Sequence, residues 1–385
     1  MRRVAAIVAA TAFVAALVGA STAEASKFIR KGMYDDAQVL YGDPDKVFPI
    51  LRDMGTQVLR VNLWWGGPNG VASRRPANAS SSSDPAYDWS TYDRTVRYSA
   101  AFGLKPIFTV LGTPSWANGN RGWNKAPTSG ADLKAFVTAA ARRYNGSFRL
   151  PDGTRGRVAS WIAWNEPNNP VFLKPQFVRT SNRWVIQSAK DYARICNAVV
   201  AGAKLANPSN KVACGVTSPR GNNQPGTARS SVSPLAFLRA MYLAGARGFD
   251  AYAHHPYYGG ASETPDTKPP LGKRGQPPTA VTLGNFDELV KELTKSYGKM
   301  RIWVTEYGYQ TNPPDRIFGV SPAKQALYMR QAWDKVAANP RVDLFIWFLI
   351  QDEPRAGSGW QSGVYTSSGK RKPSREIFER LGTSR

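Results

Sequence analysis

Short apolar segments alternate with amphipathic stretches from one end of the chain to the other, and this alternation constrains the fold more than any other feature. Parallel strands joined by helices produce such a pattern, because each strand is buried on both faces and reads as a continuous apolar run. The clearest run covers residues 344–350. Eight strands are expected, at residues 28–34, 57–64, 105–111, 158–165, 211–216, 249–255, 301–306 and 342–350.

Helical periodicity fills the intervals between these strands, and several helices begin with Pro after an N-capping residue, as at Ser321-Pro322. Eight strands and eight helices in strict alternation predict an α/β fold, a (β/α)8 TIM barrel formed by residues 26–385 as one domain. Long segments follow three of the strands, and we expect them on the C-terminal face, where the active sites of such barrels lie. The helices are expected at residues 44–54, 91–102, 130–144, 189–206, 234–244, 285–296, 322–337 and 374–381.

The first 25 residues read as a secretory signal peptide. A basic start precedes an apolar run at residues 4–20, and Ala23-Glu24-Ala25 supplies a small-x-small cleavage site. A membrane anchor is the alternative, although the run is shorter than the roughly 20 residues that a span needs. We expect a secreted, extracellular protein, free or associated with the cell wall, with no membrane span after processing.

The formal net charge of +24 predicts attraction to anionic polymers. The basic residues are scattered, however, and no zinc-finger or aromatic RNA-binding signature accompanies them, so nucleic acid is not the expected partner. A basic surface suits an anionic cell envelope or matrix polymer. We expect a monomer.

No metal or cofactor site is expected. The two histidines are adjacent and the two cysteines are far apart, which does not match the usual spacing of a zinc site, and no dinucleotide or phosphate-binding motif is present. Cys196 and Cys214 fit either an exported disulfide or two buried thiols.

Two glutamates end strand-like runs, Glu166 in the segment 161–167 and Glu306 in the segment 301–309. An unpaired carboxylate is too costly to leave inside a core, so both should open into one cleft. Hydrolysis of a glycoside with retention needs one carboxyl group that protonates the leaving oxygen and another that attacks the anomeric carbon, about 5 to 5.5 Å apart. The ends of the fourth and seventh strands could hold two such groups across a barrel.

These two motifs resemble those of the retaining glycoside hydrolases of clan A. Asn-Glu-Pro at 165–167 is similar to the clan's strand-four motif, and Thr-Glu-Tyr-Gly at 305–308 is similar to its strand-seven motif. The resemblance covers essentially the whole mature chain. It implies that Glu166 is the acid/base and Glu306 the nucleophile that forms a covalent glycosyl-enzyme intermediate. The motif at 112–116 and the residues after strand six favour a family 39-like over a family 5-like member.

Other positions resemble the residues that support catalysis in this clan. Arg60 is a charge inside a strand, which needs a carboxylate partner, and it resembles the arginine that orients the nucleophile; the alternative is an arginine that points out between helices. Asn165 would bind the sugar 2-hydroxyl, or would only form a turn. Strand alternation directs one of His254 and His255 inward.

We expect His255 and Tyr257 to line the cleft near the nucleophile, with packing roles as the alternative. Trp347 resembles the clan's platform under the sugar, because aromatic faces suit pyranose rings. Trp116 and Trp64 fall in strand-end loops and are further candidates for sugar contacts, although some tryptophans belong to the core.

The sequence therefore predicts a secreted retaining β-glycoside hydrolase that acts on a polysaccharide or glycoconjugate. A transglycosidase with the same residues, and a carbohydrate-binding cell-wall protein without catalysis, are the alternatives.

Overall fold

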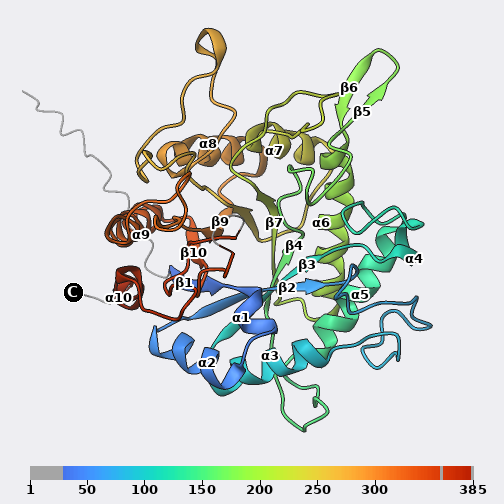
Figure 1. Ribbon diagram of the computed structural model, residues 1–385. Coiled ribbons are helices and arrows are strands. Elements are labelled where there is room, and N and C mark those ends of the chain that lie inside the picture. The colour runs from blue at the N-terminus through green and yellow to red at the C-terminus, as the bar shows by residue number, and fades with distance from the viewer. Residues whose placement is uncertain (1–28, 356–358, 383–385) are drawn as a thin grey trace, which may run out of the picture.

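A closed ring of parallel strands forms the centre of the molecule, with helices around it (Figure 1). The computed structural model describes residues 29–355 and 359–382, so the signal peptide expected at residues 1–25 lies outside the described residues. The predicted (β/α)8 TIM barrel is confirmed, and every predicted strand overlaps one strand of the ring. In ring order the strands are β1 (Arg30–Tyr34), β10 (Val342–Phe348), β9 (Arg301–Tyr307), β8 (Ala251–His254), β7 (Lys211–Thr217), β4 (Ser160–Ala163), β3 (Lys105–Leu111) and β2 (Val58–Trp64).

The eight predicted helices are all present, within two residues at each end. Local chemistry fixes their starts: the Ser321 side chain accepts a hydrogen bond from the backbone N–H of Lys324, and Asp43 accepts one from Asp45 ahead of a proline at the first helical position. The helices are α2 (Pro44–Asp53), α3 (Ser90–Ala101), α5 (Gly130–Arg143), α6 (Gln187–Ala206), α7 (Pro234–Leu243), α8 (Phe286–Tyr297), α9 (Pro322–Ala337) and α10 (Pro373–Arg380).

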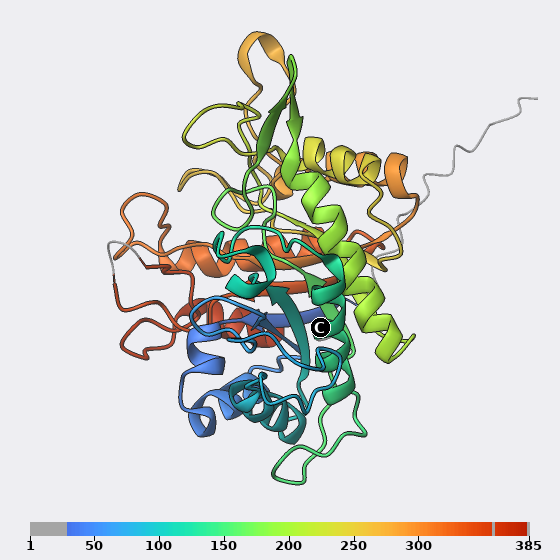
Figure 2. The same cartoon turned by 90° about the vertical axis from the view of Figure 1, so that its right-hand side faces the viewer.

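Several short elements lie in segments that were expected to be loops. The hairpin of β5 (Phe177–Thr180) and β6 (Arg183–Ile186) interrupts the segment after β4. In two perpendicular views this hairpin and the long segment after β8 project from the same side of the barrel (Figures 1 and 2). The other short elements are α1 (Asp36–Leu40), α4 (Ser115–Asn118) and the 3-10 turns η1 (Lys273–Gly275) and η2 (Leu283–Asn285).

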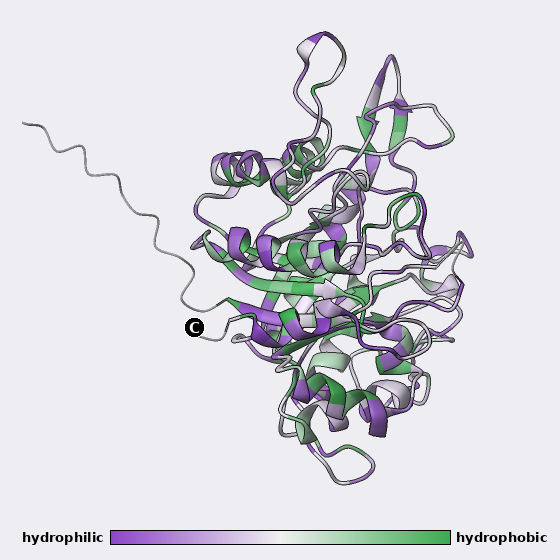
Figure 3. Cartoon of the chain, turned by 60° about the vertical axis from the view of Figure 1, so that its left-hand side comes forward, coloured by the Kyte–Doolittle hydropathy of each residue, from purple (hydrophilic) through white to green (hydrophobic). Residues whose placement is uncertain are grey.

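The core has two layers, set by the alternation of side chains along each strand. A small inner cluster includes Val58, Ile107 and Ile346 and fills the ring itself. A much larger cluster lies between the ring and the helices. Hydrophobic residues concentrate along the strands, and hydrophilic residues on the outward side of helices and in loops (Figure 3). Polar side chains that point into the ring therefore need hydrogen-bond partners inside the barrel, and they gather at its C-terminal mouth.

Cys196 on α6 and Cys214 on β7 are joined by a disulfide, with Cα atoms 5.9 Å apart. This resolves the choice between a disulfide and two thiols in favour of the disulfide, which ties a helix of the outer layer to the ring. Among the described residues, no helix combines the length and apolarity that a membrane span requires.

Candidate active site

Arg60 is the centre of the polar cluster at the C-terminal mouth of the barrel. It lies on β2, two residues after the inward-facing Val58, so alternation directs it into the ring, and its side chain is fully buried. A buried guanidinium needs several acceptors. It donates to Glu306 Oε2 at 2.8 Å and to Asn165 Oδ1 at 2.6 Å. It also donates to Thr109 Oγ1 at 3.1 Å and to the Thr305 carbonyl at 3.0 Å, and its carbon Cζ lies 4.3 Å from the ring centre of Tyr34.

Glu306 reaches this mouth through a β-bulge. Between residues 304 and 307 the strand β9 contains one residue more than the facing stretch of β10, and such an extra residue re-aims the side chains next to it. One carboxylate oxygen accepts from Arg60, and the other accepts from the Tyr257 hydroxyl at 2.9 Å. Both oxygens of Glu306 are thus held in place.

Glu166 lies three residues after the end of β4 and has an unusual backbone. Its φ is +38°, in the left-handed region that residues other than glycine rarely adopt. The side chain lies beside two others: His255 Nδ1 is 3.0 Å from Oε1, and Asn169 Nδ2 donates to Oε2 at 3.1 Å. Burial raises the pKa of Glu166 to about 7, although the hydrogen bond from Asn169 and the charge of Arg60 act in the opposite direction.

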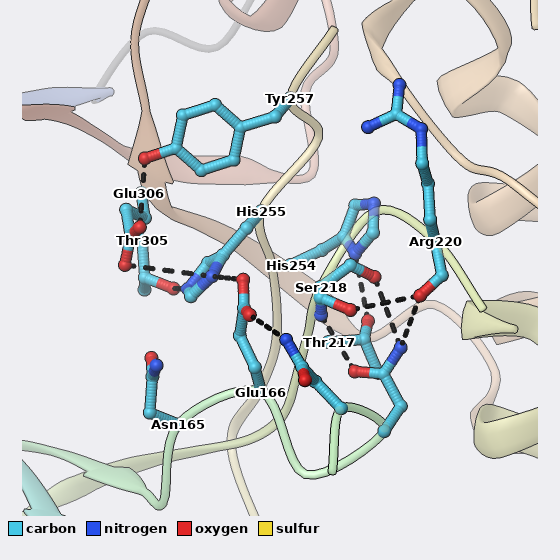
Figure 4. Close-up of polar contacts among 12 residues, drawn as sticks. Asn165, Glu166, Thr217, Ser218, Arg220, His254, His255, Tyr257, Thr305 and Glu306 are labelled. Atoms are coloured by element: carbon cyan, nitrogen blue, oxygen red, sulfur yellow. Dashed lines mark hydrogen bonds and ion pairs between the residues drawn. The ribbon is translucent and has the colours of Figure 1, made fainter. Parts of the chain in front are cut away.

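The two carboxylates face one space (Figure 4). An oxygen of Glu166 and an oxygen of Glu306 lie within 4.8 Å of each other, and each side chain keeps 13% of its surface exposed. Glu166, Glu306 and His255 together could also surround a cation by distance alone. The Arg60 guanidinium, 2.8 Å from Glu306, opposes such a cation by its charge.

His255 is buried between the two carboxylates, and burial lowers its pKa to about 3, so the ring is neutral at ordinary pH. Its Nε2 lies 3.3 Å from Arg60 Nη1 and 3.1 Å from Thr305 Oγ1. Arginine can only donate, so Nε2 is the acceptor and Nδ1 carries the proton toward Glu166. His254 faces the other way, with Nε2 3.0 Å from the Val281 carbonyl.

The expected role of Trp347 as a sugar platform is wrong. Its side chain is fully buried, and its indole N–H donates to the Ser362 carbonyl at 2.8 Å. The reason is alternation: Leu344 and Ile346 belong to the inner cluster of the ring, so the neighbouring Trp347 points outward to the helices. The inward position at the mouth is Phe348, which is partly exposed.

Phe348 is part of an aromatic row that the sequence reasoning missed. Its ring centre lies 5.2 Å from that of Tyr34 and 5.7 Å from that of Trp360, which is 48% exposed. Counting by twos from Leu344 identifies Phe348, whereas Trp360 follows the strand and carries no such signal. Asn169, the partner of Glu166, was also missed, because only the turn after β4 brings it back to the carboxylate.

The two other candidate tryptophans differ in placement. Trp64 is partly buried and meets Trp123 edge to face, with ring centres 5.3 Å apart, beside a cavity of about 270 Å³ that includes Trp123 in its lining. Trp116 packs against the loop after β2. Its indole N–H donates to the Ala72 carbonyl, and the Arg75 guanidinium lies 4.7 Å from its ring centre.

One family model matches most of the chain. The model of the family described as "Family of unknown function (DUF5722)" matches residues 117–385. No curated protein sequence matches the chain.

Solved structures share the fold of this chain. A family 39 glycoside hydrolase from Bacteroides cellulosilyticus WH2 is 20% identical, with a TM-score of 0.62 over 92% of this chain and 64% of that chain. A GH39 β-xylosidase from Caulobacter crescentus is 16% identical, with a TM-score of 0.59 over 93% of this chain and 72% of that one. The GH53 catalytic domain from Ignisphaera aggregans is 18% identical, with a TM-score of 0.58 over 93% of this chain and 97% of that one. The chain thus spans less than two thirds of the Bacteroides protein, and the resemblance to clan A is confirmed at the level of the fold.

Proposed function

The chain belongs to the DUF5722 family, and we propose that it is a retaining β-glycoside hydrolase acting on a polysaccharide or glycoconjugate. One observation carries the proposal: carboxylates from the ends of β4 and β9 have oxygens within 4.8 Å of each other at one mouth of a closed barrel. Retaining enzymes hold their carboxyl groups about 5 to 5.5 Å apart, whereas inverting enzymes leave about 6.5 Å or more for a water molecule. Solved structures of the same fold are glycoside hydrolases, which supports the same reaction class.

In the first step, Glu306 attacks the anomeric carbon while Glu166 transfers its proton to the leaving oxygen. The bond to the leaving group breaks, and a glycosyl ester forms on Glu306. In the second step Glu166, now ionised, removes a proton from water as the water attacks the anomeric carbon and releases Glu306. A pKa of about 7 suits both roles, because the carboxyl group can hold or release a proton near neutral pH.

Asn165 and Arg60 position the reacting groups. Asn165 Oδ1 already accepts from Arg60, which leaves Nδ2 to donate to the sugar 2-hydroxyl. Tyr257 and Arg60 hold the two oxygens of Glu306 on either side. The row of Tyr34, Phe348 and Trp360 offers apolar ring faces to a pyranose at the mouth.

Export is part of the proposal. The basic start, apolar run and small-residue site at residues 1–25 support it, and a disulfide fits an oxidising compartment. Expression in the native host with sequencing of the secreted N-terminus should give Ser26 as the first residue; protein retained in the cell with residues 1–25 attached would contradict export.

Activity on a panel of aryl β-glycosides tests the reaction. Glu306→Gln should abolish turnover while sugar binding remains, and binding without turnover by the unaltered protein would instead indicate a carbohydrate-binding protein. Glu166→Ala should keep activity on substrates with good leaving groups and should be accelerated by azide, which replaces the missing base. Absence of azide rescue would contradict the role of Glu166.

A further inference from the structure

A second cavity of about 550 Å³ lies between the loops that follow β7 and β8, and its lining includes neither proposed catalytic glutamate; this is the size of a small-ligand site. Two loops line it: residues 220–231 after β7, and residues 259–280 after β8. Three charged side chains face it, those of Arg220, Arg229 and Glu263. The lining is therefore positive by one charge, and none of the proposed catalytic steps uses these residues.

Neither Arg220 nor Arg229 has a hydrogen-bond partner for its side chain among the described residues, and Glu263 is the carboxylate whose charge acts on Arg220. Within residues 29–355 and 359–382, no acceptor lies at hydrogen-bonding distance from either guanidinium group, whereas Glu263 Oε2 already accepts from the Gly259 N–H at 2.7 Å. Partial burial lowers the pKa of Arg220, with the charge of Glu263 acting in the opposite direction. Both arginine side chains are exposed, so each guanidinium group can bind an anion that enters the cavity.

The cavity is connected to the proposed catalytic residues on both sides. Asn168, two residues after Glu166, is fully buried; its Nδ2 donates to the Val232 carbonyl at 2.9 Å, and its Oδ1 accepts from the Ser218 N–H at 2.8 Å. This amide fixes the base of the loop that carries Arg220.

On the other side, Tyr257 holds Glu306, and the chain reaches the cavity at Gly259 within two residues, a span of at most about 7 Å. Figure 4 shows Arg220 beyond His254 and Ser218, as seen from Glu306. A chain of sugars bound across the carboxylates can therefore extend into this cavity.

An exposed aromatic ring borders the same loop. Trp184, on β6 of the projecting hairpin, is 44% exposed, and a Cβ added to Gly226 would lie 3.5 Å from its indole ring. The indole thus lies against the loop that carries Arg220 and Arg229, where its free surface can stack on a pyranose.

We propose that this cavity is a subsite for an acidic sugar unit of the glycan, with Arg220 and Arg229 binding its anionic substituent. The inference rests on the proposed function for the position of the glycan, and it names the substrate class as acidic glycans. The recognised chemistry is an oxyanion, either the carboxylate of a uronate or a sulfate ester, since guanidinium groups bind both.

Calorimetric titration of the Glu306→Gln protein tests the proposal, because binding is measured without turnover. The probes are a glucuronate-containing tetrasaccharide, its carboxyl-reduced neutral counterpart, and a neutral tetrasaccharide carrying one sulfate ester. We expect one of the acidic probes to bind at least about tenfold more tightly than the neutral one, and the tighter of the two identifies the oxyanion.

Arg220→Gln and Arg229→Gln should each weaken the acidic probe about tenfold and leave the neutral probe unchanged. The matched control is Arg155→Gln, which removes the same charge from an exposed position in the loop before β4, at the opposite end of the barrel; it should have no effect. Equal affinity for acidic and neutral probes, or a preference that survives the Arg220→Gln/Arg229→Gln double substitution, would overturn the inference.

The proposed hydrolase function and the acidic-sugar subsite can be refuted independently. Hydrolysis of neutral glycans by the unaltered protein without any acidic preference would remove this inference and leave the proposed function intact. Binding of the acidic probes that depends on Arg220 and Arg229, without hydrolysis of any probe, would support the acidic subsite and contradict the proposed function.

Discussion

Glu166→Gln should make the protein more stable at alkaline pH while it removes activity on substrates with poor leaving groups. The folded protein holds this carboxyl group largely out of water, which raises its pKa from the ordinary 4.5 to about 7. A carboxyl group whose pKa is higher in the folded state opposes folding once the solution is basic enough to ionise it. Glutamine has a similar shape and no charge, so it relieves this penalty.

The size of the effect follows from the two pKa values. A tenfold change in proton affinity corresponds to about 1.4 kcal/mol, so the interval from 4.5 to about 7 sets an upper limit of roughly 3 kcal/mol. The folded state binds more protons than the unfolded state between these values, so the penalty grows as pH rises through this window. It is fully present above pH 7 and nearly absent at pH 4. Glutamine can keep the hydrogen bond from His255 through its amide oxygen, but its amide nitrogen cannot accept the one from Asn169, so we expect a gain of about 1 to 3 kcal/mol.

Urea denaturation of both proteins at pH 4 and pH 8 measures this difference. The Glu166→Gln protein should have the higher free energy of unfolding at pH 8, and the two proteins should agree at pH 4. Equal stability at both values, or a less stable variant at pH 8, would show that Glu166 is not held in a desolvated environment and that its pKa is not raised.

The turnover of poor-leaving-group substrates should fall as pH rises above about 7, when Glu166 loses its proton, and an unchanged rate at pH 9 would contradict this. Arg60→Met should leave Glu306 without its ion pair and lower the unfolding free energy by about 3 kcal/mol; denaturation curves that coincide would contradict the buried pair. Replacing both Cys196 and Cys214 with serine should lower the free energy of unfolding by about 3 kcal/mol. An unchanged free energy of unfolding under non-reducing conditions would argue against the disulfide. Phe348→Ala should raise KM about tenfold with little change in kcat, whereas Trp347→Phe should alter stability and not KM; the opposite pattern would restore Trp347 as the sugar platform.

The barrel could be predicted because its signals are local. Buried parallel strands are continuous apolar runs, and capped helices separate them, so each of the eight units is visible within about 40 residues of sequence. The two glutamates could be found because each ends a strand, where water begins. The ordinal positions of those strands place both side chains at one mouth.

The errors arise where a side-chain direction or a long-range contact decides the outcome. The sequence favours Trp347 over Phe348 because a tryptophan stands at the strand end, whereas the alternation set by the inner cluster directs Phe348 inward. The bulge that turns Glu306 inward depends on the pairing of β9 with β10, and the left-handed backbone of Glu166 depends on the turn after β4. The hairpin of β5 and β6 is short and polar, and its sequence differs little from a loop.

The anomeric configuration of the first product tests most directly whether Glu306 is the nucleophile. Proton NMR of the reaction with a β-glycoside in its first minutes, before mutarotation, distinguishes the two outcomes. Carboxylate oxygens within 4.8 Å of each other predict that the β-anomer is formed first, by double displacement on Glu306. Initial formation of the α-anomer would mean direct attack by water, and would contradict the assignment of Glu306 as the nucleophile.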